Sequence, residues 1–166
     1  MVIRCFTGEE VVVPGDHLSG VDLRSMNLHR ADLANQDLTG AKLDQSDLRG
    51  AELVGAILWE ASFVEVHGMN AYFSGASCRH ASFKDAKLSY AHFDGCDLTR
   101  ANFSGSILDG VKFAGADLRG AVMLWTSYES PDFEGANFDS TTVWPDGFDA
   151  TSFGARQVTV GNGGDS

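Results

Sequence analysis

Histidine and cysteine are the residue types in this chain that most often carry chemistry, and their spacing indicates none. A metal site or an acid–base pair gathers several such side chains at one place. The five histidines of this chain instead fall on different sides and levels of the repeat that is described below. The cysteines are odd in number and lack metal-ligand spacing, so we expect buried free thiols. We therefore predict no catalytic residue, no metal site and no cofactor among His17, His29, His67, His80, His92, Cys5, Cys78 and Cys96.

The charge of the chain argues against direct binding to nucleic acid. The 166 residues carry 12 Lys and Arg against 23 Asp and Glu, a net charge of −11, whereas phosphate backbones select basic surfaces. No apolar stretch is long enough for a signal peptide or a transmembrane helix. We expect one cytoplasmic domain that contacts neither nucleic acid nor membrane.

A leucine or phenylalanine recurs at every fifth position along most of the chain. Five fits neither the 3.6-residue period of a helix nor the two-residue period of a strand. A fixed period sustained over such a length is typical of stacked repeat architectures. Between Leu18 and Phe153, the step of five meets another residue type only at Gly68, Cys78, Met123, Tyr128 and Val143.

Glycine and phenylalanine show a second period, of twenty residues, which is four pentads. Because glycine is favoured where the backbone needs a positive φ, a glycine column predicts one corner of a four-sided coil. The column consists of Gly55, Gly75, Gly95, Gly115 and Gly135. The aromatic residues agree with four sides: one column holds Phe73, Phe93, Phe113 and Phe133, and the opposite one holds Phe63, Phe83 and Phe103.

The pentads "ADLAN", "ANFSG", "ADLRG" and "ANFDS" resemble the A(D/N)LXX unit of pentapeptide repeat proteins. The resemblance implies an all-β fold, a right-handed quadrilateral β-helix of about seven four-sided coils. It also implies that the central Leu or Phe and the small residue two places before it point inward. At a strand spacing of roughly 4.8 Å, such a stack is a rod about 34 Å long.

The two ends of the chain depart from the repeat and are expected to cap it, since an open coil exposes unpaired backbone groups. We predict a cap strand or hairpin over residues 1–15 and the repeat β-helix over 16–143. A capping segment follows over 144–160, in which Phe148 and Phe153 keep the step of five. The tail 161–166 has nothing to bury and is expected to be disordered.

Two sets of apolar residues occupy outward positions and are candidate interaction patches. The set around Gly68 is either a local bulge that fills its own gap or a partner-binding belt; it comprises Ile57, Trp59, Val64, Met69 and Tyr72. The set near the C-terminus is either covered by the final segment or forms a homodimer interface; it comprises Val122, Leu124, Trp125 and Trp144.

Charge is distributed unevenly along the repeat. Residues 61–112 carry five basic and five acidic side chains, so the acidic excess lies at the two ends. Near the C-terminus a predicted ladder stacks like charges roughly 5 Å apart on successive coils; its members are Asp109, Glu129 and Asp149. Such a ladder is either a solvated face that keeps the rod soluble or part of a binding surface.

These patterns predict a non-enzymatic scaffold for protein–protein interaction whose partner the sequence does not name. The family resemblance implies an alternative, an acidic DNA mimic that binds DNA gyrase as quinolone-resistance proteins do. Duplex DNA carries one charge per roughly 1.7 Å, whereas this rod carries one per about 3 Å and is neutral in its middle. The unbroken register also lacks the projecting loops of the gyrase-protecting members, so the scaffold is favoured.

Overall fold

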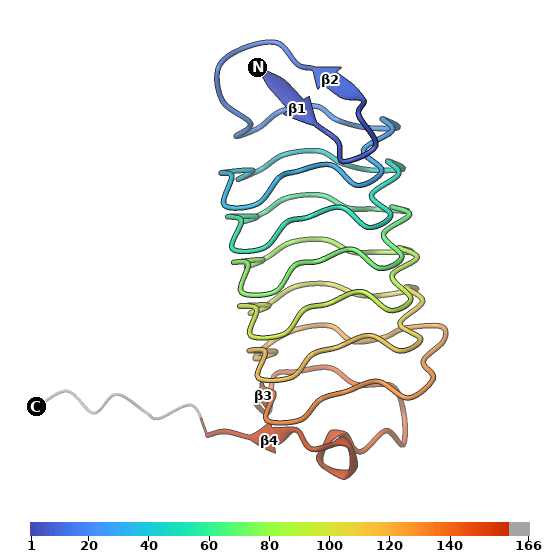
Figure 1. Ribbon diagram of the computed structural model, residues 1–166. Coiled ribbons are helices and arrows are strands. Elements are labelled where there is room, and N and C mark those ends of the chain that lie inside the picture. Colours follow the sequence, from blue (N-terminus) through green and yellow to red (C-terminus); the bar gives the residue numbers. More distant parts are fainter. Residues whose placement is uncertain (160–166) are drawn as a thin grey trace, which may run out of the picture.

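The computed structural model describes residues 1–159, which form a rod of stacked coils (Figure 1). At the N-terminal end, strands β1 (Val2–Arg4) and β2 (Glu10–Val12) pair as an antiparallel hairpin. At the other end, β3 (Asn137–Phe138) pairs in parallel with β4 (Arg156–Gln157), and the 3₁₀ helix η1 (Ala150–Phe153) precedes β4. No helix within residues 1–159 is both long and apolar enough to cross a membrane.

Each coil contains twenty residues and is hydrogen-bonded to the next. Parallel bridges join Asp32 to Glu52 and Glu52 to Tyr72, and the same spacing recurs along the rod. The N–H of Leu33, for example, donates to the carbonyl oxygen of Glu52 at 2.8 Å. The twenty-residue coil predicted from the glycine and phenylalanine columns is therefore confirmed.

Two local hydrogen bonds recur along the pentads, and the second explains the Asp or Asn that precedes the central residue. The N–H of Ala31 donates to the carbonyl oxygen of Leu28 at 2.9 Å and closes a turn between pentads. The carboxylate of Asp37 accepts from the N–H of Thr39 at 2.9 Å, an arrangement repeated at many pentads. Short polar side chains favour such turns because they satisfy a backbone donor two residues on.

The glycine column lies at a corner with positive φ, as predicted, and the backbone is left-handed at the other corners between residues 20 and 120 as well. Gly55 and Gly75 have positive φ as expected, but so do non-glycine residues at the other corners. Most of these are polar or charged and their side chains are exposed; they include Ser25, Arg30, Asn35, Gln45, Glu60, Glu65, Asn70, His80, Asp85, Tyr90 and Arg100.

The core consists of the central residues, stacked coil upon coil. From Leu18 to Met123 each is buried, with at most 2% of its surface exposed. Phe73 and Phe93 stack at 4.5 Å between ring centroids, and Phe63 and Phe83 stack at 4.8 Å. Rings of the two columns meet edge to face, as Phe63 and Phe73 do at 5.7 Å, a geometry that aromatic quadrupoles favour. The two predicted phenylalanine columns are confirmed.

Gly68 interrupts the core without interrupting the backbone. Its N–H donates to the carbonyl oxygen of Lys87 at 2.8 Å, and His67 keeps its bridges on both sides. A Cβ atom at this glycine would lie 2.9 Å from Cδ2 of Leu88. The predicted bulge is therefore absent, because the side chain of Leu88, one coil further on, occupies the space that Gly68 leaves.

The pentad register slips by one residue after Phe138, which like Phe133 is buried as predicted, so the expectation of an unbroken register to Phe153 is wrong. Val122 bridges to Val143, one residue beyond the regular step, because the turn there closes on Asp139 instead of Phe138. Tyr128 and Val143, both predicted inward, are 41% and 43% exposed. Phe148 is half-buried and Phe153 is 38% exposed. The predicted disordered tail, 161–166, lies outside the described residues.

Candidate functional site

The side chains that could do chemistry are kept apart by the fold. Within residues 1–159, no group of three His, Cys, Asp or Glu residues lies close enough to hold a metal ion. All three cysteines are buried free thiols, as expected. Burial raises the pKa of the Cys78 thiol well above its usual value, and the Cys96 thiol donates to the carbonyl oxygen of Phe73 at 2.8 Å. These thiols serve packing rather than reactivity.

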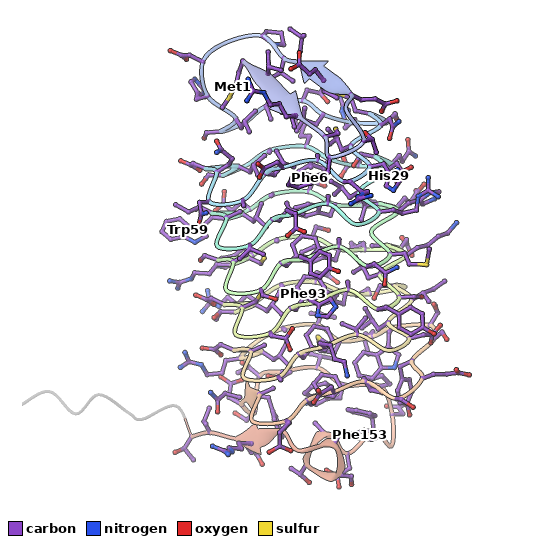
Figure 2. All side chains as sticks on the ribbon, viewed as in Figure 1. Met1, Phe6, His29, Trp59, Phe93 and Phe153 are labelled. Atoms are coloured by element: carbon purple, nitrogen blue, oxygen red, sulfur yellow. The ribbon has the colours of Figure 1, made fainter. Side chains whose placement is uncertain are left out.

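The apolar residues predicted around Gly68 do not form one patch. Ile57 and Trp59 are 41% and 47% exposed on one side of the rod, and Figure 2 shows Trp59 projecting outward. Met69 and Tyr72 lie about half a coil further along, on other sides, and are 43% and 37% exposed. Val64 is half-buried on the side between. The set surrounds the rod, and only Met69 and Tyr72 share a hollow.

The C-terminal apolar set is largely turned inward, contrary to the outward position predicted for Trp125. Only 9% of Trp125 is exposed, and its ring lies 4.9 Å from Phe148 and 5.9 Å from Trp144. Trp144 also meets Phe133 at 5.6 Å. The final segment thus covers both indoles, and the homodimer interface predicted through them loses its main contacts. Val122 is half-buried and Leu124 is 43% exposed.

The predicted acidic ladder holds together only in part. Asp109 and Glu129 lie on adjacent coils, since the N–H of Gly110 donates to the carbonyl oxygen of Glu129 at 2.7 Å. The carboxylate of Asp109 accepts from the Ser127 hydroxyl at 2.7 Å. Asp149 instead caps helix η1. Its carboxylate accepts hydrogen bonds from the hydroxyl and the N–H of Thr151, and these bonds lower the pKa of the Asp149 carboxyl. Asp149 therefore has a local structural role.

A hollow of about 410 Å³ opens where the N-terminal hairpin meets the coils. Phe6 reaches it from the β1–β2 turn, which is tied to the first coil because the Phe6 N–H donates to the carbonyl oxygen of Arg30 at 2.8 Å. Phe6 and His29 are labelled in Figure 2 near that end of the rod. The hollow is lined by Phe6, His29, Arg30, Arg49, Gly50, Glu52, Met69, Asn70 and Tyr72.

A second hollow, of about 340 Å³, adjoins the first and continues along the same side of the rod. Arg49 and Met69 line both hollows, so the two adjoin, and we call the combined surface the cationic groove. The remaining residues of the second hollow come from the next coils and are His67, Lys87, Ser89 and Ile107.

The cations of the groove are held in defined positions. The guanidinium of Arg49 donates to both carboxylate oxygens of Asp47, at 2.9 and 2.5 Å, and lowers the pKa of that carboxyl. The Lys87 ammonium lies 3.5 Å from the Nε2 atom of His67. Arg30 packs its aliphatic stem over Gly50. Neither Arg30 nor Lys87 forms an ion pair with another described residue, so both charges are available to a ligand.

A third hollow, of about 450 Å³, lies two pentads away, on the opposite side of the rod, and its charge balance differs from that of the cationic groove. Its cations face carboxylates: Arg79 lies 3.8 Å from Asp97, and Arg119 lies 2.5 Å from Asp117. The buried carboxylate of Asp139, already saturated by Thr141 and Gly120, also lines it. This side is close to neutral and serves as an internal contrast to the cationic groove.

The cationic groove was missed by sequence reasoning, although part of its signal was present. His29, Arg49 and Met69 stand twenty residues apart, and that column predicts neighbouring side chains on successive coils. The contribution of Phe6 was not available from any period, because it depends on how the hairpin docks on the first coil.

The chain matches the family model for pentapeptide repeats in eight copies, which together extend over residues 17–127. Solved structures that it resembles include Rfr23 from the cyanobacterium Cyanothece 51142, at 24% identity over 78% of this chain and 88% of that one, with a TM-score of 0.41. HetL, a pentapeptide repeat protein involved in heterocyst differentiation regulation in Nostoc, is 23% identical over 78% and 75% of the two chains, with a TM-score of 0.36.

Full-length QnrB1, a plasmid-mediated fluoroquinolone resistance protein, is 17% identical over 86% of this chain and 91% of that one, with a TM-score of 0.38. No curated protein gives a significant match. The stacked twenty-residue coils define a repeat β-solenoid. The chain belongs to the pentapeptide repeat family.

Proposed function

We propose that this protein is a non-enzymatic scaffold that binds a partner protein in the cationic groove. The observation that carries the proposal is the meeting of exposed apolar and cationic side chains in one groove. Met69 and Tyr72 expose their side chains beside Arg49, whose guanidinium is already fixed by Asp47. Interface centres are typically rich in aromatic residues, Met and Arg.

The rod supplies what such a scaffold needs, a surface that does not rearrange. Successive coils are joined by backbone hydrogen bonds at every pentad, and the stacked phenylalanines fix their spacing. A preorganised surface loses little conformational entropy when a partner binds. We further propose that the coils number about seven and wind in the right-handed sense of the family.

A capture experiment with matched variants tests this function. The wild-type protein, Arg49→Glu with Met69→Asp, and the control Arg79→Glu with Ile57→Asp are immobilised and exposed to lysate of the native host. We expect one protein to be retained by the wild type and the control but lost from the groove variant. Retention by all three forms alike would contradict the proposal.

The DNA-mimic alternative gives a different outcome in the same experiment. It requires a partner that binds an acidic face, and Asp109 and Glu129 are two acidic residues on adjacent coils toward the C-terminus. We expect no inhibition of gyrase supercoiling at low micromolar protein. Capture of gyrase subunits, lost on reversing Asp109 and Glu129 to Lys but retained by the groove variant, would replace the scaffold proposal by mimicry.

A further inference from the structure

Resting on the proposed function, we propose that the groove binds an extended acidic peptide segment of the partner. The segment lies along the rod axis, with carboxylates at both ends and an apolar side chain against Met69 and Tyr72. The charges, the shape and the limits of the groove each support this occupant.

The charges of the groove alternate with its apolar surface in an order that a peptide can match. Arg30 and Arg49 stand on the first two coils, and Lys87 stands near the other end. Between them lie Met69 and Tyr72, which are 43% and 37% exposed. Two carboxylates oppose these three cations: Glu52 in the lining, and Asp47, which is paired with Arg49. The groove therefore keeps a small positive excess, although the protein as a whole carries a charge of −11.

The dimensions of the groove fit a short extended chain. From His29 to Ile107 it crosses four coil-to-coil steps of roughly 4.8 Å, about 19 Å in all. An extended peptide rises roughly 3.3 Å per residue, so about six residues fill this length. Side chains on one face of such a peptide recur every second residue, which places alternate side chains toward the groove floor.

The groove is bounded by negative charge, which favours a short peptide over a nucleic acid. Asp109, in the same pentad as Ile107, and Glu129, one coil further on, begin the acidic part of the same side. At the hairpin end, Glu9 accepts a hydrogen bond from Asn27 at 3.2 Å. A continuous polyanion that followed the rod axis would be repelled at both ends of the groove. A segment of about six residues ends at the coil of Asp109 and does not reach Glu129.

The proposal is tested by fluorescence anisotropy with a labelled peptide of sequence Asp-Glu-Leu-Phe-Asp-Glu. We expect saturable binding with a Kd of about 10 µM that weakens as salt rises, because exposed charges are screened. Arg49→Glu and Lys87→Glu are each expected to weaken binding about tenfold, as charge reversal at a complementary surface does. Arg79→Glu, half a coil away, is expected to leave the Kd unchanged.

Two further probes decide what the groove recognises. Replacing Leu-Phe of the peptide by Ser-Ser, or its acids by Lys, is expected to abolish measurable binding. A single-stranded oligonucleotide of similar length that binds as tightly as the acidic peptide would overturn the proposal in favour of a nucleic acid. A wild-type dimer in sedimentation that Arg49→Glu dissociates would overturn it in favour of a second copy of this chain.

The failure of this inference differs from the failure of the proposed function. If the groove variant loses the captured partner while the acidic peptide binds no form of the protein, the scaffold proposal stands and the acidic segment is wrong. If the capture is insensitive to groove substitutions, the proposed function fails, whatever the peptide does.

Discussion

The regular coils and the C-terminal end bury aromatic side chains by different rules. Up to Met123 every buried aromatic ring occupies the central pentad position and stacks on the ring twenty residues away, as Phe83 does on Phe103 at 4.8 Å. Beyond it, Trp125 turns inward from a corner position that is outward elsewhere, Tyr128 turns out, and the one-residue slip at Val143 brings Trp144 to the central position below Met123. The comparison teaches that the step of five predicts burial only while each coil has another coil beneath it. At the end of the stack, packing against the last ring of the column, Phe133, decides which side chains are buried, and the five-residue period does not.

The largest expected effect distinguishes inward from outward positions inside the coils. Phe83→Asp places a carboxylate between Phe63 and Phe103 in a dry core, and we expect cooperative unfolding to be lost. Its exposed neighbour is the matched control: Lys84→Asp is expected to change the free energy of unfolding by less than about 0.5 kcal/mol. Urea denaturation followed by circular dichroism measures both, and similar midpoints for the two variants would contradict the register.

At the C-terminal end, two adjacent residues that were both predicted to point outward are expected to differ in their contribution to stability. Trp125→Ala removes a ring packed on Phe148 and Trp144, and we expect a loss of about 3 kcal/mol. Leu124→Ala, at a side chain that is 43% exposed, is expected to cost less than about 1 kcal/mol. If Leu124→Ala proved the more costly of the two, the interior role of Trp125 would have to be abandoned.

Corner glycines allow a finer comparison between two positions with the same φ of +65°. Nothing lies within 4 Å of a Cβ atom at Gly95, whereas one at Gly110 would lie 2.5 Å from the Tyr90 ring. We expect Gly95→Ala to cost about 1 kcal/mol for the strained backbone and Gly110→Ala about 1 kcal/mol more for displacing Tyr90. In the Tyr90→Ala background, Gly110→Ala is expected to cost no more than Gly95→Ala does in the wild type. Thermal unfolding of Gly95→Ala, Gly110→Ala, Tyr90→Ala and the double variant measures this, and an unchanged extra cost would exclude the Tyr90 contact as its cause.

The smallest expected effect concerns acid stability. Hydrogen bonds from Arg119 lower the pKa of the Asp117 carboxyl, so its contribution is present above the unfolded value of about 3.9 and is lost as the pH falls through the lower folded value. Because Arg119 is 45% exposed, we expect only a few tenths of a kcal/mol. Urea titrations at neutral and acidic pH should show a smaller acid-induced loss in Asp117→Asn than in the wild type; an equal loss would exclude this pair as a contributor.

Much of the fold follows from the sequence because one period dictates it. Every central residue from Leu18 to Met123 is buried as the step of five predicts, and the phenylalanine columns stack as the step of twenty predicts. The left-handed corners were only partly visible, because residues such as Arg30 and Tyr90 adopt positive φ without glycine. Composition does not reveal a strain that the surrounding hydrogen bonds impose.

The candidate site was less predictable because it depends on contacts that no period encodes. Met69 and Tyr72 were identified as exposed, but their cationic neighbours come from a column that was not followed, and Phe6 comes from the hairpin. The slip at Val143 depends on a turn that closes on Asp139, where Thr141 and Thr142 donate to one carboxylate. Local side-chain hydrogen bonds of this kind compete with the repeat and are settled only in three dimensions.

Methionine-methyl NMR tests the central claim, that the groove is the binding surface, most directly. Of the four methionines, Met69 lies in the groove and is 43% exposed, Met123 is fully buried and Met1 is 39% exposed on the hairpin. On titration with the acidic peptide, or with the captured partner, we expect the Met69 methyl signal to shift while those of Met1 and Met123 stay in place. An unchanged Met69 signal at saturating ligand would contradict the assignment of binding to the cationic groove.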